Sequence, residues 1–172
     1  MIRTTHIGID PGRTSGGIAY LTSHDTSPVA LAMPKTDTDV LNMIRELAEG
    51  EDQAICFHLE EIPLFVGGGK AAASIIKVKG HQSLIEGMIR MAQVMISTSE
   101  KQISINMIPP KRWQKGLSIP PKVRSESSPQ WKRRLKEVAA KMFPTAKITA
   151  NTADALLIME FGRRESRSSP SF

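Results

Sequence analysis

The sequence has one cysteine, Cys56, among its 172 residues. A single cysteine cannot form an internal disulfide bond or a metal site of several thiolates. No apolar run approaches the roughly 18 residues that a membrane-spanning helix needs. The apolar segment Ile2–Ile9 is too short for a signal peptide and is followed by Asp10 and Pro11. We therefore expect a protein of a reducing cytoplasm, with no secretion signal and no membrane partner.

Acidic residues are in the minority. The chain has 23 lysines and arginines against 17 aspartates and glutamates, a formal net charge of +6. An apolar content of 40 % excludes a wholly disordered chain, and the length suits one domain of ordinary size. The excess of positive charge favours an acidic partner, nucleic acid first and a membrane surface second. Aromatic residues make up only 5 %, so base stacking is not expected as the main binding mode.

The positive charge is concentrated in one segment. Residues 1–110 carry a net charge of −3, residues 111–147 carry +9, and residues 148–172 carry 0. An acidic body with one basic segment is typical of a site with an electrostatic footprint for nucleic acid. The alternative is a solvated lysine-rich helix face that only keeps the protein soluble.

Hydrophobic patterns predict an α/β fold. Alternating or continuous apolar runs predict five strands, at Thr5–Ile9, Gly16–Leu21, Val29–Met33, Ala54–Leu59 and Ile103–Ile108. Helical spacing predicts helices at Asp37–Glu49, about Ala72–Thr98, Gln130–Phe143 and Asn151–Arg164, with a short helical turn at Pro109–Lys115. A hairpin meander that passes into crossover helices predicts a mixed sheet with helices on both faces. The segment 165–172 is expected to be a disordered tail.

Three carboxylates stand out by their context. Asp10 and Glu60 end apolar strands, and Asp154 begins an apolar helix. If the two strands are neighbours, both acids emerge at one end of the sheet, where a helix could add Asp154. Such a cluster needs a cation, and oxygen ligands suit Mg²⁺ or Mn²⁺. Taken singly, these acids also fit a turn residue, a solvated strand end and a helix-dipole partner.

Four motifs occur in order along the chain: Ile7-Gly8-Ile9-Asp10-Pro11-Gly12, Gly16-Gly17-Ile18-Ala19, Leu59-Glu60-Glu61-Ile62 and Ala153-Asp154-Ala155-Leu156-Leu157-Ile158. Their order and spacing resemble the RuvC-type Holliday junction resolvases over about residues 5–164. The run Pro110-Lys111-Arg112-Trp113-Gln114-Lys115 and Phe143-Pro144 resemble the phage and chloroplast branch. The resemblance implies an RNase H-like fold with a five-stranded mixed sheet, in a nuclease domain at residues 1–164.

The resemblance also implies a function. It points to a homodimeric endodeoxyribonuclease of a phage- or bacterium-like cytoplasm or an organelle nucleoid. Such an enzyme resolves four-way DNA junctions by paired symmetric nicks, with two Mg²⁺ or Mn²⁺ ions per site. By motif position, Asp10, Glu60 and Asp154 carry over as metal ligands and catalytic residues, and Lys132 matches a catalytic lysine near the scissile phosphate. The family usually has a fourth ligand, Asp or His, where this chain has Asn151, so Asn151 is the candidate fourth ligand. It lies at i−3 from Asp154 and is expected on the same side of the helix, where its neutral amide oxygen can bind a hard cation.

Further residues are candidates for contact with DNA. The cations and the histidine expected on the DNA-binding face are Lys70, Lys77, Lys79, His81, Lys111, Arg112, Lys115, Lys122, Arg124 and Arg133. Phe65 is a candidate wedge at the junction crossover, or it simply covers the core. Two alternatives remain open: a nuclease of the same fold that acts on RNA or other branched DNA, and a non-catalytic DNA-binding module.

Overall fold

Five strands and five helices form in the order that the hydrophobic pattern predicts. The computed structural model describes residues 2–63 and 70–168, with only the backbone of residues 70–72. The strands are β1 (Thr4–Asp10), β2 (Gly17–Leu21), β3 (Val29–Ala32), β4 (Ala54–Glu60) and β5 (Gln102–Ile108). The helices are α1 (Asp37–Ala48), α2 (Lys70–Ile96), α3 (Pro110–Gly116), α4 (Ser128–Met142) and α5 (Ala153–Ser168).

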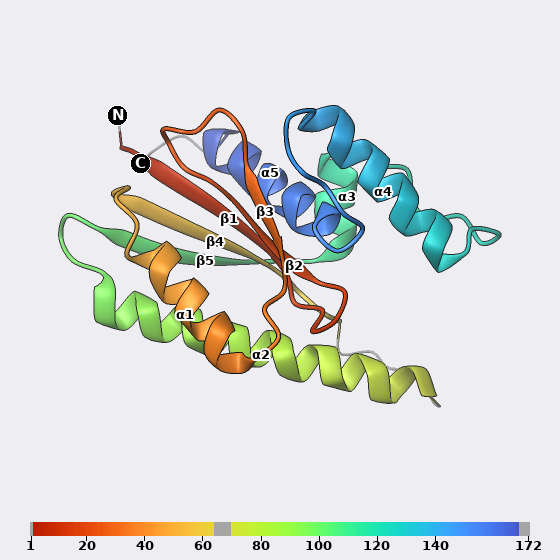
Figure 1. Cartoon of the computed structure of the whole chain (residues 1–172), viewed down its shortest axis with the longest axis horizontal. Helices are drawn as coiled ribbons and strands as arrows, with labels where there is room; N and C mark the ends of the chain where they lie inside the picture. The colour runs from red at the N-terminus through yellow and green to blue at the C-terminus, as the bar shows by residue number, and fades with distance from the viewer. Residues whose placement is uncertain (1, 64–69, 169–172) are drawn as a thin grey trace.

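The strands form one mixed sheet in the order β3-β2-β1-β4-β5. Loops at residues 11–16 and 22–28 make β2 antiparallel to β1 and β3, while the crossover helices α1 and α2 allow β4 and β5 to run parallel to β1. Helices cover both faces: α1 and α2 lie on one side and α5 on the other, with α3 and α4 packed around α5 (Figure 1). The predicted RNase H-like fold class is therefore confirmed.

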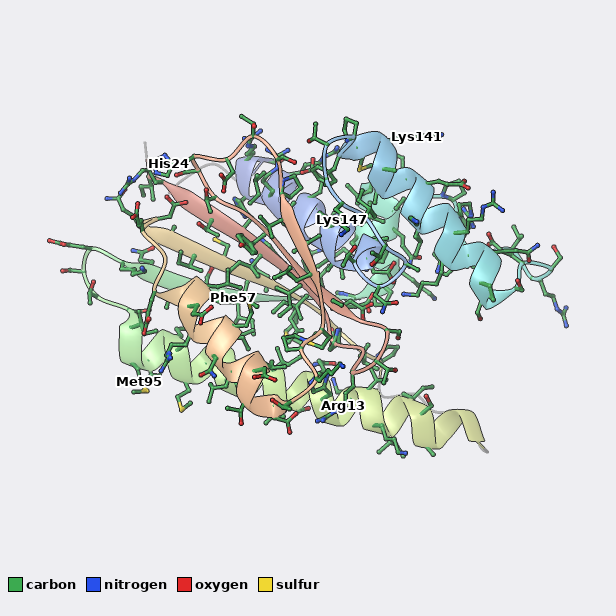
Figure 2. The ribbon with its side chains drawn as sticks, viewed as in Figure 1. Arg13, His24, Phe57, Met95, Lys141 and Lys147 are labelled. Atoms are coloured by element: carbon green, nitrogen blue, oxygen red, sulfur yellow. The ribbon has the colours of Figure 1, made fainter. Side chains whose placement is uncertain are left out.

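Successive side chains of the central strands point to opposite faces of the sheet. Odd-numbered side chains, such as Ile9, Phe57 and Leu59, pack in the core under α1 and α2; Phe57 is labelled there (Figure 2). Because side chains alternate along a strand, Asp10 and Glu60 belong to the opposite face, which α5 covers. The binary pattern of the strands thus determines which helix meets the acids.

Close contact between β1 and α5 depends on Gly8. A Cβ atom at this position would lie 2.2 Å from the Ala155 carbonyl oxygen and 2.4 Å from the Met159 backbone nitrogen. Those atoms belong to a buried helix backbone and cannot simply rotate away. The absence of a side chain at Gly8 therefore lets α5 approach the strand that ends in Asp10.

The ends of α5 differ from the prediction. The helix begins at Ala153 instead of Asn151, because the Thr149 carbonyl accepts hydrogen bonds from the Thr152 and Ala153 backbone amides in a turn before the helix. At the other end, α5 continues to Ser168, so the tail expected from residue 165 is helical over its first four residues. Residues 169–172 of that tail lie outside the described residues. Over the described ranges, every helix is too short or too polar to span a bilayer.

Candidate active site

The three predicted acids lie close to one another. Asp10 is the last residue of β1 and Glu60 the last of β4, and these strands are parallel neighbours, so both side chains emerge at the same edge. Asp154 lies in the first turn of α5, which packs on that face. Asp10 and Asp154 are each only 7 % exposed. The end of the sheet therefore gathers three largely buried carboxylates from three elements.

Lys132 on α4 supplies positive charge to this cluster. Its ammonium group donates a hydrogen bond to the Asp154 Oδ2 atom and lies 3.7 Å from the Asp10 Oδ2 atom. Burial lowers the pKa of Lys132, but the carboxylates of Asp154 and Asp10 outweigh burial and leave this pKa above its ordinary value. The lysine therefore remains charged among the acids.

The carboxylates hold their protons more tightly than free acids do. Burial, followed by the charge of Asp154, raises the pKa of Asp10 to about 6. Burial, followed by the charges of Asp10 and Asp154, raises the pKa of Glu60 to about 8. Burial also raises the pKa of Asp154, although Lys132 opposes the change. One ammonium does not compensate three buried carboxylates, so the cluster favours additional positive charge.

Hydrogen bonds orient two of the acids and leave an oxygen of the third unpaired. The Gly12 backbone amide donates to Asp10 Oδ1 at 3.1 Å, and the Trp113 indole donates to Glu60 Oε1 at 3.0 Å. Asp154 Oδ1 is buried, and no group among the described residues forms a hydrogen bond with it. An unpaired buried carboxylate oxygen and a set of hard oxygen donors fit a divalent cation such as Mg²⁺.

The acids do not form a ready-made coordination cage. Across residues 2–63 and 70–168, no three His, Cys, Asp or Glu side chains converge closely enough to hold one metal ion. The contact of Lys132 with two of the three acids accounts for this arrangement, because the ammonium takes up carboxylate oxygens that a cation would need. A metal ion would therefore require the lysine and the carboxylates to adjust.

Asn151 does not lie on the helix that was expected to present it. It precedes the start of α5 and is partly buried, and its amide nitrogen lies 3.5 Å from the Thr14 carbonyl oxygen in the β1–β2 turn. The helical spacing to Asp154 therefore does not apply, and the expectation that both side chains share one helix face is wrong.

Most of the predicted DNA-contacting cations are on the surface. The exposed residues of this set are Lys77, Lys111, Arg112, Lys115, Lys122, Arg124 and Arg133, whereas Lys79 is half-buried and donates to Gln82 Oε1. Arg112 also pairs with Glu165 at 2.8 Å. The side chain of Lys70 and the whole of Phe65 lie outside the described residues.

His81 is the exception in this set, because it cannot reach a ligand on the surface. Its side chain is 3 % exposed, and its Nδ1 atom lies 2.7 Å from the Pro11 carbonyl oxygen. The prediction that His81 faces DNA from the long helix is wrong: the histidine instead ties α2 to the turn that follows Asp10. Helical periodicity placed the residue on α2 but could not show that this face meets the turn.

Arg134 has a structural role that the charge pattern did not indicate. Its guanidinium group pairs with the Glu126 carboxylate at 2.8 Å and donates to the carbonyl oxygens of Pro120 and Pro121 at 2.8 and 3.2 Å. These contacts fix the basic loop between α3 and α4 against α4. The loop that carries Lys122 and Arg124 is thereby held beside the helix that carries Lys132.

The α5 side of the sheet also buries a pair of histidines. His6 Nδ1 and His58 Nε2 lie 3.1 Å apart, and the two rings stack with their centroids 5.4 Å apart. Burial lowers the pKa of His6 to about 4 and that of His58 to about 3. The period-two pattern could have placed both residues on one face, but their lack of ligand spacing gave no reason to pair them.

A mixed five-stranded sheet with acids at the ends of adjacent parallel strands defines an RNase H-like α/β fold with a candidate active site. This fold is similar to that of solved RuvC structures. The chain superposes on Thermus thermophilus RuvC in complex with a Holliday junction substrate with a TM-score of 0.57, at 14 % identity and 96 % coverage of both chains. A second Thermus thermophilus RuvC structure gives a TM-score of 0.55 at 14 % identity, covering 95 % of this chain and 96 % of the other. No protein-family model and no curated protein matches the sequence.

Proposed function

We propose that the chain is a structure-selective endodeoxyribonuclease that resolves four-way DNA junctions, with its nuclease domain at residues 1–164. The observation that carries this proposal is the cluster of Asp10, Glu60 and Asp154 around Lys132 at one edge of a RuvC-type sheet. Buried carboxylates that need positive charge, in a chain with a basic segment, suit phosphodiester hydrolysis with divalent cations.

Asp10, Glu60 and Asp154 are the proposed ligands of two Mg²⁺ or Mn²⁺ ions. Their oxygens are hard donors, and the unpaired Asp154 Oδ1 atom offers a free ligand position. Asn151 would add at most a neutral amide oxygen. When bound, such ions activate water and stabilise the leaving oxygen of a phosphodiester.

Lys132 has a proposed role on the reacting phosphate. Its ammonium already lies within the acidic cluster, so a small movement of its side chain would bring it beside a phosphate oxygen at the same place. There it would offset negative charge that develops on the phosphate, as positioned cations do in phosphoryl transfer. The protein then retains positive charge near the acids while DNA enters.

The basic residues around the cluster form the proposed DNA footprint. Phosphate contacts from α3, α4 and the loop between them would position the junction and make binding strongly dependent on salt. The members proposed for this footprint are Lys77, Lys79, Lys111, Arg112, Lys115, Lys122, Arg124 and Arg133. Lys70 and Phe65 remain proposals from the sequence, as a phosphate contact and a wedge at the crossover.

The protein is proposed to act as a homodimer, because paired nicks need two active sites on one junction. Support comes from α2, whose surface carries Ile76, Val94 and Met95 with exposures of 63 %, 84 % and 76 %. Met95 projects from this helix away from the sheet (Figure 2). Gly80 and Gly87 lie on the same helix with open space at their Cβ positions, so a second helix could approach closely there.

The test is incubation with a synthetic four-way junction and Mg²⁺ or Mn²⁺, followed by mapping of the cuts. We expect paired symmetric nicks from the natural sequence. Asp10→Asn should lose cleavage by at least about 100-fold while it still binds the junction, because it removes a ligand charge and not the basic footprint. Normal cutting by the Asp10→Asn variant would show that the acidic cluster is not the active site.

Two results would redirect the proposal. Faster cleavage of RNA, flaps or other branched DNA than of the four-way junction would change the substrate class. Junction binding without any nick over a Mn²⁺ titration would favour a non-catalytic module, an alternative that the neutral Asn151 leaves open. Parallel assays with junction, flap, duplex and RNA substrates separate these outcomes.

A further inference from the structure

Trp113 links the buried core of the α3 side to the acidic cluster. The residue lies in the middle of α3 and is 1 % exposed, packed in the hydrophobic cluster that includes Leu117, Leu135 and Phe161. Its indole Nε1–H donates a hydrogen bond to the Glu60 Oε1 atom at 3.0 Å. One edge of this core side chain therefore touches a residue of the candidate active site.

The hydrogen bond from Trp113 does more than satisfy a buried indole N–H, because it also supplies a donor to the Glu60 carboxylate. Among the described residues, Trp113 is the one side chain that donates a hydrogen bond to Glu60. The carboxylate experiences repulsion from Asp10 and Asp154, so without a donor it has no fixed orientation in the cluster. Because α3 packs against α5, the indole is held by contacts that do not depend on Glu60 itself.

Metal ligands commonly need such support from neighbouring groups. A donor that fixes one oxygen of a carboxylate orients the other oxygen and lowers the cost of ordering the ligand when a cation binds. The indole is well suited to this task, since it is rigid, uncharged and always a donor. It carries no positive charge that would compete with the cation for the carboxylate, as a lysine would, and no oxygen that would itself bind the cation, as a second carboxylate would.

We propose that Trp113 is a positioning residue, whose indole N–H holds the Glu60 carboxylate in the orientation that a divalent cation requires. The inference rests on the proposed function in so far as Glu60 is a metal ligand. It goes further by giving one side chain of the hydrophobic core around α3 a role in supporting the metal site. It also places Trp113 between two exposed cations of the same helix, Lys111 and Lys115, which belong to the proposed DNA footprint.

The test measures the affinity of the 172-residue chain for Mn²⁺, from the electron paramagnetic resonance signal of the free ion. Two variants remove the donor: Trp113→Phe, and replacement of Trp113 by 3-benzothienylalanine, which keeps the two-ring shape but has sulfur in place of N–H. We expect both to raise the Mn²⁺ dissociation constant by about 10-fold or more, the usual effect of losing such a supporting contact. The isosteric replacement should do so with a smaller fall in the thermal unfolding temperature than Trp113→Phe, because it keeps the packing of the two-ring side chain.

Two further variants give the experiment its controls. Leu117→Ala removes a core contact at the C-terminal cap of α3 without removing the donor, so it should lower the unfolding temperature and leave Mn²⁺ affinity unchanged. Glu60→Gln removes the ligand charge and should weaken Mn²⁺ binding more than either change at Trp113.

The outcomes distinguish the positioning role of Trp113 from the proposed metal site at Glu60. If Glu60→Gln weakens Mn²⁺ binding but the isosteric replacement does not, the positioning role is overturned while the metal site stands. Equal weakening by Leu117→Ala would also overturn it, because general loosening of α3 would then explain the effect. If Glu60→Gln leaves Mn²⁺ affinity unchanged, the proposed metal site itself is wrong and the role of Trp113 falls with it.

Discussion

At the scale of single residues, the histidine pair gives the structure a sensitivity to acid that is independent of metal ions. His6 has a pKa of about 4 in the fold, because burial and then the charges of Arg163 and Arg167 disfavour its protonated form. An unfolded histidine titrates near 6.5. The unfolded chain therefore binds more protons than the folded one between these values, so stability is present above pH 6.5 and is lost as the pH falls toward 4.

We expect His6→Asn to flatten this loss, since the asparagine amide can still accept a hydrogen bond from His58 Nε2 but does not titrate. At pH 5 the natural sequence should lose about 2 kcal/mol of stability through His6 relative to pH 7.5, and the variant should not. Urea unfolding of both proteins at the two pH values measures the difference. Comparing the two proteins cancels the opposite contribution of the acidic cluster. A difference between them that does not change with pH would contradict the prediction.

A feature of the site could be predicted from the sequence where it depends on residues close together in the chain, and not where it depends on how distant elements pack. Asp10 and Glu60 could be predicted, because each follows an apolar strand and parallel neighbours end at one edge. The contact between His6 and His58 could not, because it depends on the strand register, which opposes Gly8 to His58. The Trp113 hydrogen bond likewise depends on how α3 packs against the sheet, a non-local result that leaves no pattern in the sequence.

At the scale of elements, the fold was predictable where periodicity is strong and less so at helix ends. The five strands and the long α2 follow the hydrophobic pattern, whereas the start of α5 depends on a turn at Thr149 that competes with the helix. That small shift decides whether Asn151 shares a helix face with Asp154. For the candidate active site, the separation between β1 and α5 is more important than the start of α5, because this separation determines the distance between Asp10 and Asp154.

Gly8→Ala tests this separation. The added methyl group would meet the Ala155 carbonyl and the Met159 amide of α5, so we expect a loss of about 1–3 kcal/mol in the free energy of unfolding, or more where the backbone cannot adjust. Cleavage should fall as well, because α5 carries Asp154. Gly50→Ala is a matched control: its nearest atom is the Leu47 carbonyl oxygen at 3.2 Å, so it should cost far less. Urea unfolding and junction cleavage of both variants make the comparison, and equal stabilities would show that α5 moves freely on β1.

At the scale of the whole molecule, the net charge of +6 conceals two opposing regions. The segment before residue 111 carries −3 and includes Asp10 and Glu60, whereas residues 111–147 carry +9 and include α3, α4 and Lys132. The fold brings the basic segment back to the acidic edge through the contact of Lys132 with Asp154. Positive charge therefore surrounds a cluster that would otherwise repel DNA, and one chain offers one such site.

Cutting a four-way junction at two symmetric positions needs two active sites. We propose that α2 brings them together by packing against the α2 helix of a second copy of the chain. The 27 residues of α2 give a helix about 40 Å long, and it carries the exposed apolar side chains of Ile76, Val94 and Met95. Val94→Glu places a charge on this surface, at a position that is 84 % exposed and so costs the monomer nothing in packing.

We expect Val94→Glu to change the mass measured by light scattering from that of a dimer to that of a monomer, and to reduce paired nicks to single ones. Val123→Glu is the matched control, because Val123 is also exposed, at 58 %, but lies in the loop between α3 and α4. This variant should remain dimeric while it weakens DNA binding, since it adds negative charge to the basic footprint. A dimeric Val94→Glu protein would exclude this surface as the interface. A monomeric natural sequence would mean that the two sites meet only on the junction, where DNA rather than α2 brings them together.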